Sequence, residues 1–130
     1  MAFNDRDRRT KQAVGFDENL AARVRRILAD RTDVEEKRMF GGVCFLVGGS
    51  MSCGVIKEDL CVRIGPEAHD TALAAPHTRP MDFTGRPMRG FVYVEADGLR
   101  NGASLRKWVR LGVEYALLVG PRPKRKSVKA

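Results

Sequence analysis

Three thiols and two imidazoles are the side chains best suited to metal binding or nucleophilic catalysis in this sequence: Cys44, Cys53, Cys61, His69 and His77. Their spacing matches neither a C-x-x-C nor an H-x-x-x-H pattern, and it matches no zinc ribbon. No serine lies in a G-x-S-x-G elbow, and the sequence contains no P-loop and no G-x-G-x-x-G. We therefore expect no cofactor, no bound metal and no catalytic centre, with both histidines on the surface.

Cys44 and Cys53 are a candidate cross-strand thiol pair. If Gly48-Gly49 forms a two-residue hairpin turn, these two cysteines lie opposite each other on neighbouring strands. Their Cβ atoms would then be about 4.5–5.5 Å apart, whereas a disulfide needs about 3.5–4.5 Å, so the bond would be strained. We expect reduced core thiols in a reducing cytoplasm, and a redox switch is the alternative.

The arginine-rich segment 79–90 is the second candidate for chemistry. Our structural interpretation is that its Met and Phe side chains fill the core while Asp82 pairs with an arginine such as Arg38 or Arg63. The alternative is an anion or protein-docking site built from the arginines. The candidate interaction or loop-pinning residues are Lys37, Arg38, Arg63, Arg79, Asp82, Arg86 and Arg89.

The net charge of +8 is concentrated at the chain ends. Residues 1–12 carry a net +2, residues 121–130 a net +5, and the remaining 108 residues only +1. A basic tail attracts nucleic acids or anionic membranes in a salt-dependent way, although it is also typical of a solvated terminus. The residues available for nucleic-acid contact are Arg122, Lys124, Arg125, Lys126 and Lys129.

The size and composition predict one globular domain. The chain has 130 residues, of which 43% are hydrophobic and 31% charged. No apolar run approaches the roughly 20 residues of a membrane helix, and the polar N-terminus is not a secretory signal, so we expect a cytoplasmic protein without membrane contact. We expect a disordered arm over 1–15, a folded domain over 16–120 and a basic tail over 121–130.

The pattern of the first half predicts a helix followed by a meander of three or four strands. Asp17 is the expected N-cap of a helix with a Leu20, Val24, Ile27, Leu28 stripe. From Val34 the pattern alternates as in a strand, and further strands follow over 43–47, 51–56 and 60–64.

The second half predicts a helix, one or two strands and a last helix. Gly65-Pro66 begins the helix, which ends by Pro76, and the loop 76–89 holds a short strand at 81–83. A strand over 90–95 precedes a helix capped by Ser104 and ended by Gly120-Pro121. This order, α-β-β-β-(β)-α-β-β-α, predicts an α+β two-layer sandwich with an antiparallel sheet and helices.

The strands 43–47 and 51–56 are apolar on both faces. One face holds Val43, Phe45 and Val47, and we place Cys44, Leu46, Met51 and Cys53 on the other. Helices on one side of a two-layer fold cannot cover both faces, so we expect a homodimer. The alternative is that the loop 76–89 folds over the second face.

Two segments resemble the signatures of the TfoX N-terminal domain family. They are KRMFGG at 37–42 and RPMDFTGRPMRG at 79–90, the latter followed by Tyr93-Val94. The resemblance covers about residues 17–119 and implies a two-layer sandwich similar to secretion chaperones. Full-length members regulate natural competence in bacteria together with the cyclic-AMP receptor protein, and they carry a second domain. We expect this chain to be a single-domain member, and the family implies no catalytic residues.

Three functional hypotheses follow from the residues and the resemblance. The first is a non-enzymatic protein-interaction module that takes part in transcriptional regulation, with a regulator protein as partner. The second is a nucleic-acid-associated protein that uses the basic tail. The third is a small ligand-binding domain with a site at the arginine-rich segment.

Overall fold

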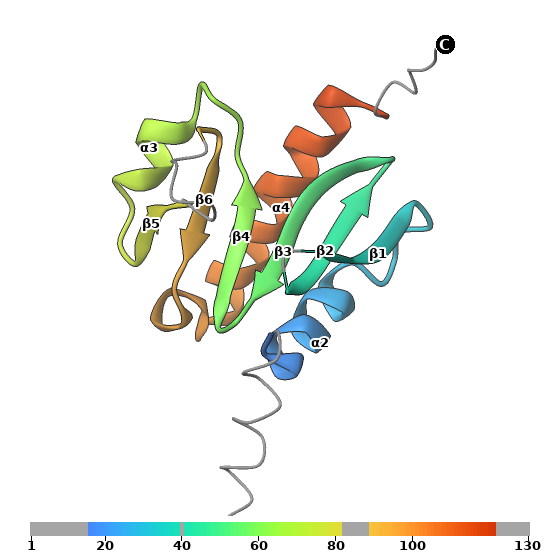
Figure 1. The fold of residues 1–130 in the computed structure, drawn as a ribbon, viewed down its shortest axis with the longest axis horizontal. Helices are drawn as coiled ribbons and strands as arrows, with labels where there is room; N and C mark the ends of the chain where they lie inside the picture. The colour runs from blue at the N-terminus through green and yellow to red at the C-terminus, as the bar shows by residue number, and fades with distance from the viewer. Residues whose placement is uncertain (1–15, 40, 82–88, 122–130) are drawn as a thin grey trace, which may run out of the picture.

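Six antiparallel strands form one sheet in a computed structural model that describes residues 16–39, 41–81 and 89–121. The strand order is β1-β2-β3-β4-β6-β5, and α4 crosses one face of the sheet with α2 packed beside it (Figure 1). The elements are α2 (Glu18–Ile27), β1 (Val34–Met39), β2 (Gly42–Val47), β3 (Ser50–Ile56), β4 (Asp59–Arg63), α3 (His69–Leu73), β5 (Thr78–Pro80), β6 (Phe91–Val94), the 3-10 helix η1 (Ala96–Leu99) and α4 (Gly102–Val119). The predicted α+β class and element order are confirmed.

Helix α2 begins where the sequence predicts. The Asp17 carboxylate accepts hydrogen bonds from the backbone N–H groups of Asn19 and Leu20, at 2.9 and 3.2 Å. This satisfies two of the N–H groups that a helix start leaves without partners. Leu20 and Val24 are buried, so the predicted apolar stripe faces the core.

A two-residue turn joins β2 to β3, also as predicted. Gly48 and Gly49 have φ angles of 60° and 88°, which other residues rarely adopt. Val47 pairs with Ser50 directly beside the turn. The turn chemistry of the glycine pair therefore fixes the start of the β2–β3 register.

The prediction that Cys44 lies opposite Cys53 is wrong. Cys44 pairs with Gly54 and Cys53 pairs with Phe45, because a bulge leaves Ser52 as an extra residue in β3. The Ser52 hydroxyl donates a hydrogen bond to the carbonyl oxygen of Phe45 at 3.0 Å within this bulge. Since side chains alternate along a strand, Cys44 and Cys53 lie on opposite faces of the sheet.

The main core lies between the sheet and its helices. Phe45, Val55, Leu60 and Val62 are fully buried on the helix-covered face. Helix α4 contributes Leu105, Trp108, Val109, Val113 and Ala116 to the same core. A Cβ atom at Gly112 would collide with the carbonyl oxygen of Ser52, so this glycine sets how closely α4 approaches the bulge in β3.

The second helix begins later than the sequence predicts. Residues 66–68 form a turn, and α3 begins at His69 instead of Pro66. Gly65 has φ 91°, and the Tyr115 ring occupies the space that a Cβ there would need, so this position before the turn requires glycine.

The short strand lies at Thr78–Pro80, not at 81–83. Thr78 pairs with Val94 and Pro80 with Val92. Met81 follows the strand and is buried on the other face of the sheet. Residues 82–83 lie outside the described part of the chain.

Asn101 caps the last helix, and the predicted cap at Ser104 is wrong. The Asn101 side chain accepts a hydrogen bond from Ala103 N–H at 2.7 Å, whereas the Ser104 hydroxyl donates to the Gly98 carbonyl oxygen at 2.7 Å. The helix ends at Gly120, whose φ is 79°, as the sequence predicts.

Several predictions fall on residues that the structure does not describe. These are the arm over 1–15 and all but the first residue of the tail 121–130. Within the described ranges, no helix is both long and apolar enough to cross a membrane.

Candidate functional site

The face of the sheet opposite the helices carries most of the predicted site residues that can be placed. We call it the open face. The strand pairings place on it Glu35, Lys37, Cys44, Leu46, Met51, Gly54, Ile56, Asp59, Cys61, Arg63, Arg79, Phe91 and Tyr93. One cross-strand row runs through all six strands, with Lys37 at one end and Arg79 at the other.

A small apolar cluster occupies part of the open face. Cys61, Met81 and Tyr93 form its buried centre, and Met51, Ile56 and Phe91 pack around them half-buried. The Cys61 and Met81 sulfur atoms are 3.2 Å apart. Met81 comes from the segment 76–89, so that segment covers part of the second face, as one of the two alternatives predicted. No residue of the described helices belongs to this cluster.

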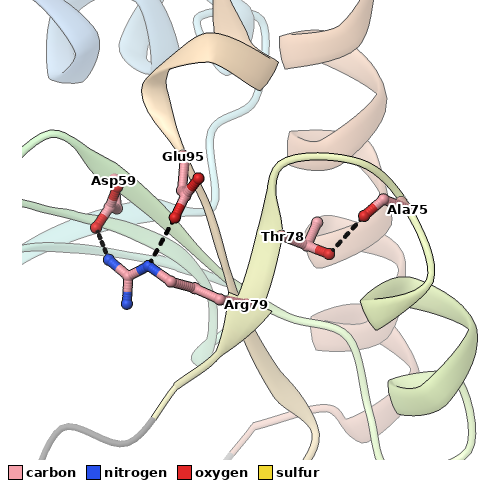
Figure 2. Close-up of polar contacts among 5 residues, drawn as sticks. All are labelled: Asp59, Ala75, Thr78, Arg79 and Glu95. Atoms are coloured by element: carbon pink, nitrogen blue, oxygen red, sulfur yellow. Dashed lines mark hydrogen bonds and ion pairs between the residues drawn. The ribbon is translucent and has the colours of Figure 1, made fainter.

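Arg79 is the best-connected charged side chain on the open face. Its Nε donates to Glu95 Oε2 at 3.0 Å and its Nη2 donates to Asp59 Oδ2 (Figure 2). Its guanidinium also lies over the Tyr93 ring, 4.5 Å from the ring centroid. The two carboxylates and the ring therefore hold the guanidinium plane in one orientation.

The neighbouring Thr78 anchors β5 to α3. Its hydroxyl donates to the carbonyl oxygen of Ala75 at 2.8 Å (Figure 2). The carbonyl oxygens of Ala72 and Leu73 lie 3.2 Å from the same hydroxyl. These carbonyl groups belong to the C-terminal end of a short helix, where backbone acceptors lack helical partners. The Thr78 hydroxyl thus provides a hydrogen-bond donor for carbonyl groups at the end of α3, and it fixes the strand that carries Arg79.

Sequence reasoning missed the partners of Arg79. It assigned Asp82 to an arginine, but Asp82 and Arg86 lie outside the described residues. Asp59 and Glu95 are distant from Arg79 in sequence, and the pairings of β6 with both β4 and β5 bring all three together. An acidic residue at the end of a strand next to an edge arginine is the signal that could have indicated the contact.

The pKa of the Asp59 carboxyl is raised above its ordinary value. Burial raises its pKa, the nearby Arg79 guanidinium opposes that rise, and the carboxylates of Glu95 and Glu58 add to it. Asp59 and Glu95 also line an open surface hollow of about 400 Å³, whose other walls are Lys57, Glu58, Ala96 and Asp97. Across the described residues, no group of side chains has the composition of a metal site.

The remaining predicted cations do not converge on one point. The Arg38 guanidinium lies 5.0 Å from the centroid of the Phe16 ring on the helix side. Arg63 lies over the Phe91 and Tyr115 rings, at 5.9 and 5.3 Å. Arg89 donates to the Pro66 carbonyl oxygen at 3.1 Å and lies 3.6 Å from the Asp70 carboxylate. Lys37 is opposite Cys44.

The predicted site arginines that can be placed, Arg38, Arg63, Arg79 and Arg89, are therefore held at separate points, and they form no shared anion pocket in this part of the chain. Arg122, Lys124, Arg125, Lys126 and Lys129 of the basic tail lie outside the described residues.

The three thiols are poor nucleophiles in this environment. All are buried and free. Burial raises the pKa of Cys44 to about 11 and that of Cys53 to about 12, and it raises the pKa of Cys61 as well. Because the thiolate is the reactive form, almost none of it is present at neutral pH.

His69 is buried, so the prediction of a surface histidine is wrong there. Its Nδ1 accepts a hydrogen bond from the Gly90 N–H at 3.0 Å, which ties α3 to the start of β6. His77 is exposed, as predicted, and has φ 67° in the turn before β5. His69 Nδ1 therefore serves as an acceptor for a backbone N–H group.

Comparison with known proteins identifies the family. The family model of the TfoX N-terminal domain matches residues 26–116, which include both signature segments. Searches of curated proteins and of solved structures gave no match. Because the family model covers most of the sequence, the chain belongs to the TfoX N-terminal domain family.

Proposed function

We propose that this chain is a non-enzymatic protein-interaction module of the competence-regulator type, which binds a protein partner through the open face of its sheet. The observation that carries the proposal is the apolar cluster on that face. Leu46, Met51, Ile56 and Phe91 are half-buried there, and the described helices pack on the opposite side. Half-exposed methionine and aromatic side chains beside arginine are the composition that protein interfaces favour.

The arginines of the open face support the same proposal. Arg79 is fixed by Asp59, Glu95 and the Tyr93 ring, and Arg63 lies over Phe91. A side chain that is already ordered loses little conformational entropy when a partner binds. These arginines can therefore contribute contacts at the edge of an apolar patch at low entropic cost.

Family membership supports the regulatory part of the proposal, because full-length relatives act in competence regulation. The thiols and His69 favour a binding module over an enzyme, since the former are protonated and the latter is used as a backbone acceptor.

A capture experiment with matched surface variants tests the open face. We would immobilise the full chain, its Leu46→Lys variant and its Leu118→Lys variant, and expose each to bacterial lysate and to purified cyclic-AMP receptor protein. Leu118 is 80% exposed on α4, so it controls for adding a lysine in place of a leucine elsewhere. Thermal unfolding would verify that each variant is folded, and Met51→Lys provides a second open-face variant.

We expect a protein that the wild type and Leu118→Lys retain and that both open-face variants lose by at least about tenfold in affinity. Equal retention by folded versions of all four proteins would contradict the proposal. So would the absence of any specifically retained protein.

A second candidate function is nucleic-acid association, which a pair of arginines on α4 favours. Arg106 and Arg110 lie one helical turn apart, both are exposed, and neither forms an ion pair with another described residue. Their charges add to the net +5 of residues 121–130 at the end of the same helix. Unpaired cations of this kind attract phosphate backbones without reading sequence.

A salt titration of duplex DNA binding distinguishes this candidate. Each lost phosphate contact should reduce the steepness of log affinity against log salt by about 0.9. We expect Arg106→Ser/Arg110→Ser and a chain without residues 121–130 both to reduce it, while Lys57→Ser, an exposed lysine in the β3–β4 turn, leaves it unchanged. An unchanged slope in both altered chains would rule the candidate out.

A further inference from the structure

The sheet has two edges of different character. β5 forms one edge and has three residues, of which the last is Pro80, which lacks an N–H group. β1 forms the other edge and has six residues, Val34–Met39. It pairs with β2 on one side, and its last five residues are exposed. A long exposed edge presents a row of backbone donors and acceptors that another strand can pair with.

β1 carries two acids followed by two bases, and each face of the strand receives one of each. Glu35 and Lys37 lie on the open face. Glu36 and Arg38 lie on the helix side, where Glu36 accepts from Arg25 at 2.6 Å and Arg38 covers the Phe16 ring. The charges on the helix side are therefore already engaged within the chain, whereas Glu35 and Lys37 have no ion pair to another described residue.

Edge strands are often charged simply to discourage pairing. Charges of one sign would repel any identical strand. In β1, an acid and a base two positions apart on the same face make the strand complementary to an antiparallel copy of itself.

Two-fold symmetry limits the registers in which β1 can pair with β1. In an antiparallel pair, residues directly opposite each other point to the same face of the sheet. The two-fold axis must therefore lie at a residue that faces its own copy, and not midway between two neighbouring residues. An axis at Glu36 places Glu35 opposite Lys37 of the second copy, and it does so twice. Glu36 then meets its own copy, but each of these carboxylates has Arg25 beside it.

An axis at Lys37 is less favourable. It places Lys37 opposite its own copy, without an ion-pair partner among the described residues, and it places Glu35 opposite Met39. This register does pair Glu36 with Arg38, but both side chains already have partners within their own chain. The first register therefore forms new ion pairs from free charges, and the second does not.

We infer that two copies of this chain associate through antiparallel pairing of their β1 edges about an axis at Glu36, with Glu35 of each copy facing Lys37 of the other. The two sheets become one continuous sheet, and the open faces of both copies lie on the same side of it. This association leaves the open face accessible, so it does not depend on the partner binding proposed above.

Charge exchange at Glu35 and Lys37 tests the interface. Sedimentation of the full chain would be measured over a concentration series up to about 1 mM, a range that includes weak dimers. Each single variant, Glu35→Lys or Lys37→Glu, turns two attractive cross-strand pairs into two repulsive ones, so we expect the dimer Kd to rise at least about tenfold. The double variant Glu35→Lys/Lys37→Glu reverses every pair and should restore dimerisation to within about threefold.

Lys107→Glu on α4 is the matched control, because Lys107 is exposed, the change in net charge equals that of Lys37→Glu, and α4 packs against β2, β3 and β4. It should leave the dimer Kd unchanged, and thermal unfolding would verify that every variant is folded. Three results would overturn the inference: a wild type that stays monomeric throughout, single variants that dimerise like the wild type, or a double variant that fails to recover. None of them bears on capture by the open face, which a monomer can perform.

Discussion

Arg79 shows how one side chain can join three elements of this fold. It extends from β5, contacts Asp59 at the start of β4 and Glu95 after β6, and covers the Tyr93 ring between them. Since β5 is short and lies at the edge, these contacts fix a strand that few backbone hydrogen bonds would hold. Of the two carboxylates, Asp59 is the less exposed, with 17% of its side chain in contact with solvent against 47% for Glu95.

The raised pKa of Asp59 leads to a prediction about stability and pH. Its folded-state pKa lies above the unfolded value, so keeping the carboxyl ionised at pH 7 lowers the free energy of unfolding. Asp59→Asn removes this cost and keeps an oxygen that can accept from Arg79. We therefore expect the variant to be more stable than the wild type at pH 7, by less than about 1 kcal/mol because the carboxyl is partly in water.

The gain should disappear as the pH falls below the unfolded pKa of about 3.9, where both states of Asp59 are protonated. Thermal unfolding of the wild type and Asp59→Asn between pH 3 and pH 7 measures this difference in stability. Asp97→Asn is the control, since Asp97 is 64% exposed in its pair with Arg100 and should change little. A clear loss of stability for Asp59→Asn at pH 7 would mean that attraction to Arg79 outweighs burial.

At the scale of elements, the contact between α4 and β3 depends on two small irregularities that fit each other. The bulge at Ser52 pushes its carbonyl oxygen toward the helix, and Gly112 leaves room for it. By helix propensity alone, alanine is better than glycine inside a helix by about 1 kcal/mol. Packing opposes that preference here, because the new Cβ would overlap backbone that cannot rotate away.

We therefore expect Gly112→Ala to lower the free energy of unfolding by about 1–3 kcal/mol, the usual range for an overpacked site. Gly102→Ala in the same helix is the control. The nearest atom to its new Cβ is the flexible end of Arg106 at 3.6 Å, so stability should be unchanged or slightly higher. Urea unfolding of both variants measures the difference, and equal stabilities would refute the close-packing account.

Periodicity and turn chemistry predicted the elements well. The alternation that starts at Val34, the Gly48-Gly49 turn and the Asp17 cap are local signals, and each was confirmed. The bulge at Ser52 has no such signal, because one inserted residue in a uniformly β-forming run leaves the composition unchanged. That single residue moved Cys53 to the other face of the sheet and removed the predicted thiol pair.

The candidate site was harder to predict for a related reason. Arg79 was identified, but its partners lie beside it only because β6 pairs with both β4 and β5. Thr78–Pro80 is too short, and too poor in apolar residues, to stand out as a strand. Non-local strand pairing therefore decides which carboxylates meet Arg79, and the local sequence pattern carries no information about that pairing.

At the scale of the whole molecule, the helices cover one face of the sheet, and the two sides of the molecule have different chemistry. The covered side holds the large apolar core, whereas the open face combines a small apolar cluster with ordered arginines. If a partner binds the open face and a second copy pairs at β1, the two contacts use separate surfaces. A dimer would then present two partner sites side by side.

The difference between the two edges also limits how far the molecule can assemble. Growth of a fibre by strand addition needs two pairing edges on every subunit, one to accept the previous copy and one to offer to the next. In the described part of this chain only β1 is a long edge, since β5 stops at Pro80 after three residues. If two copies pair about a two-fold axis as inferred, that edge is used in both copies at once, and self-association would stop at two even at high protein concentration.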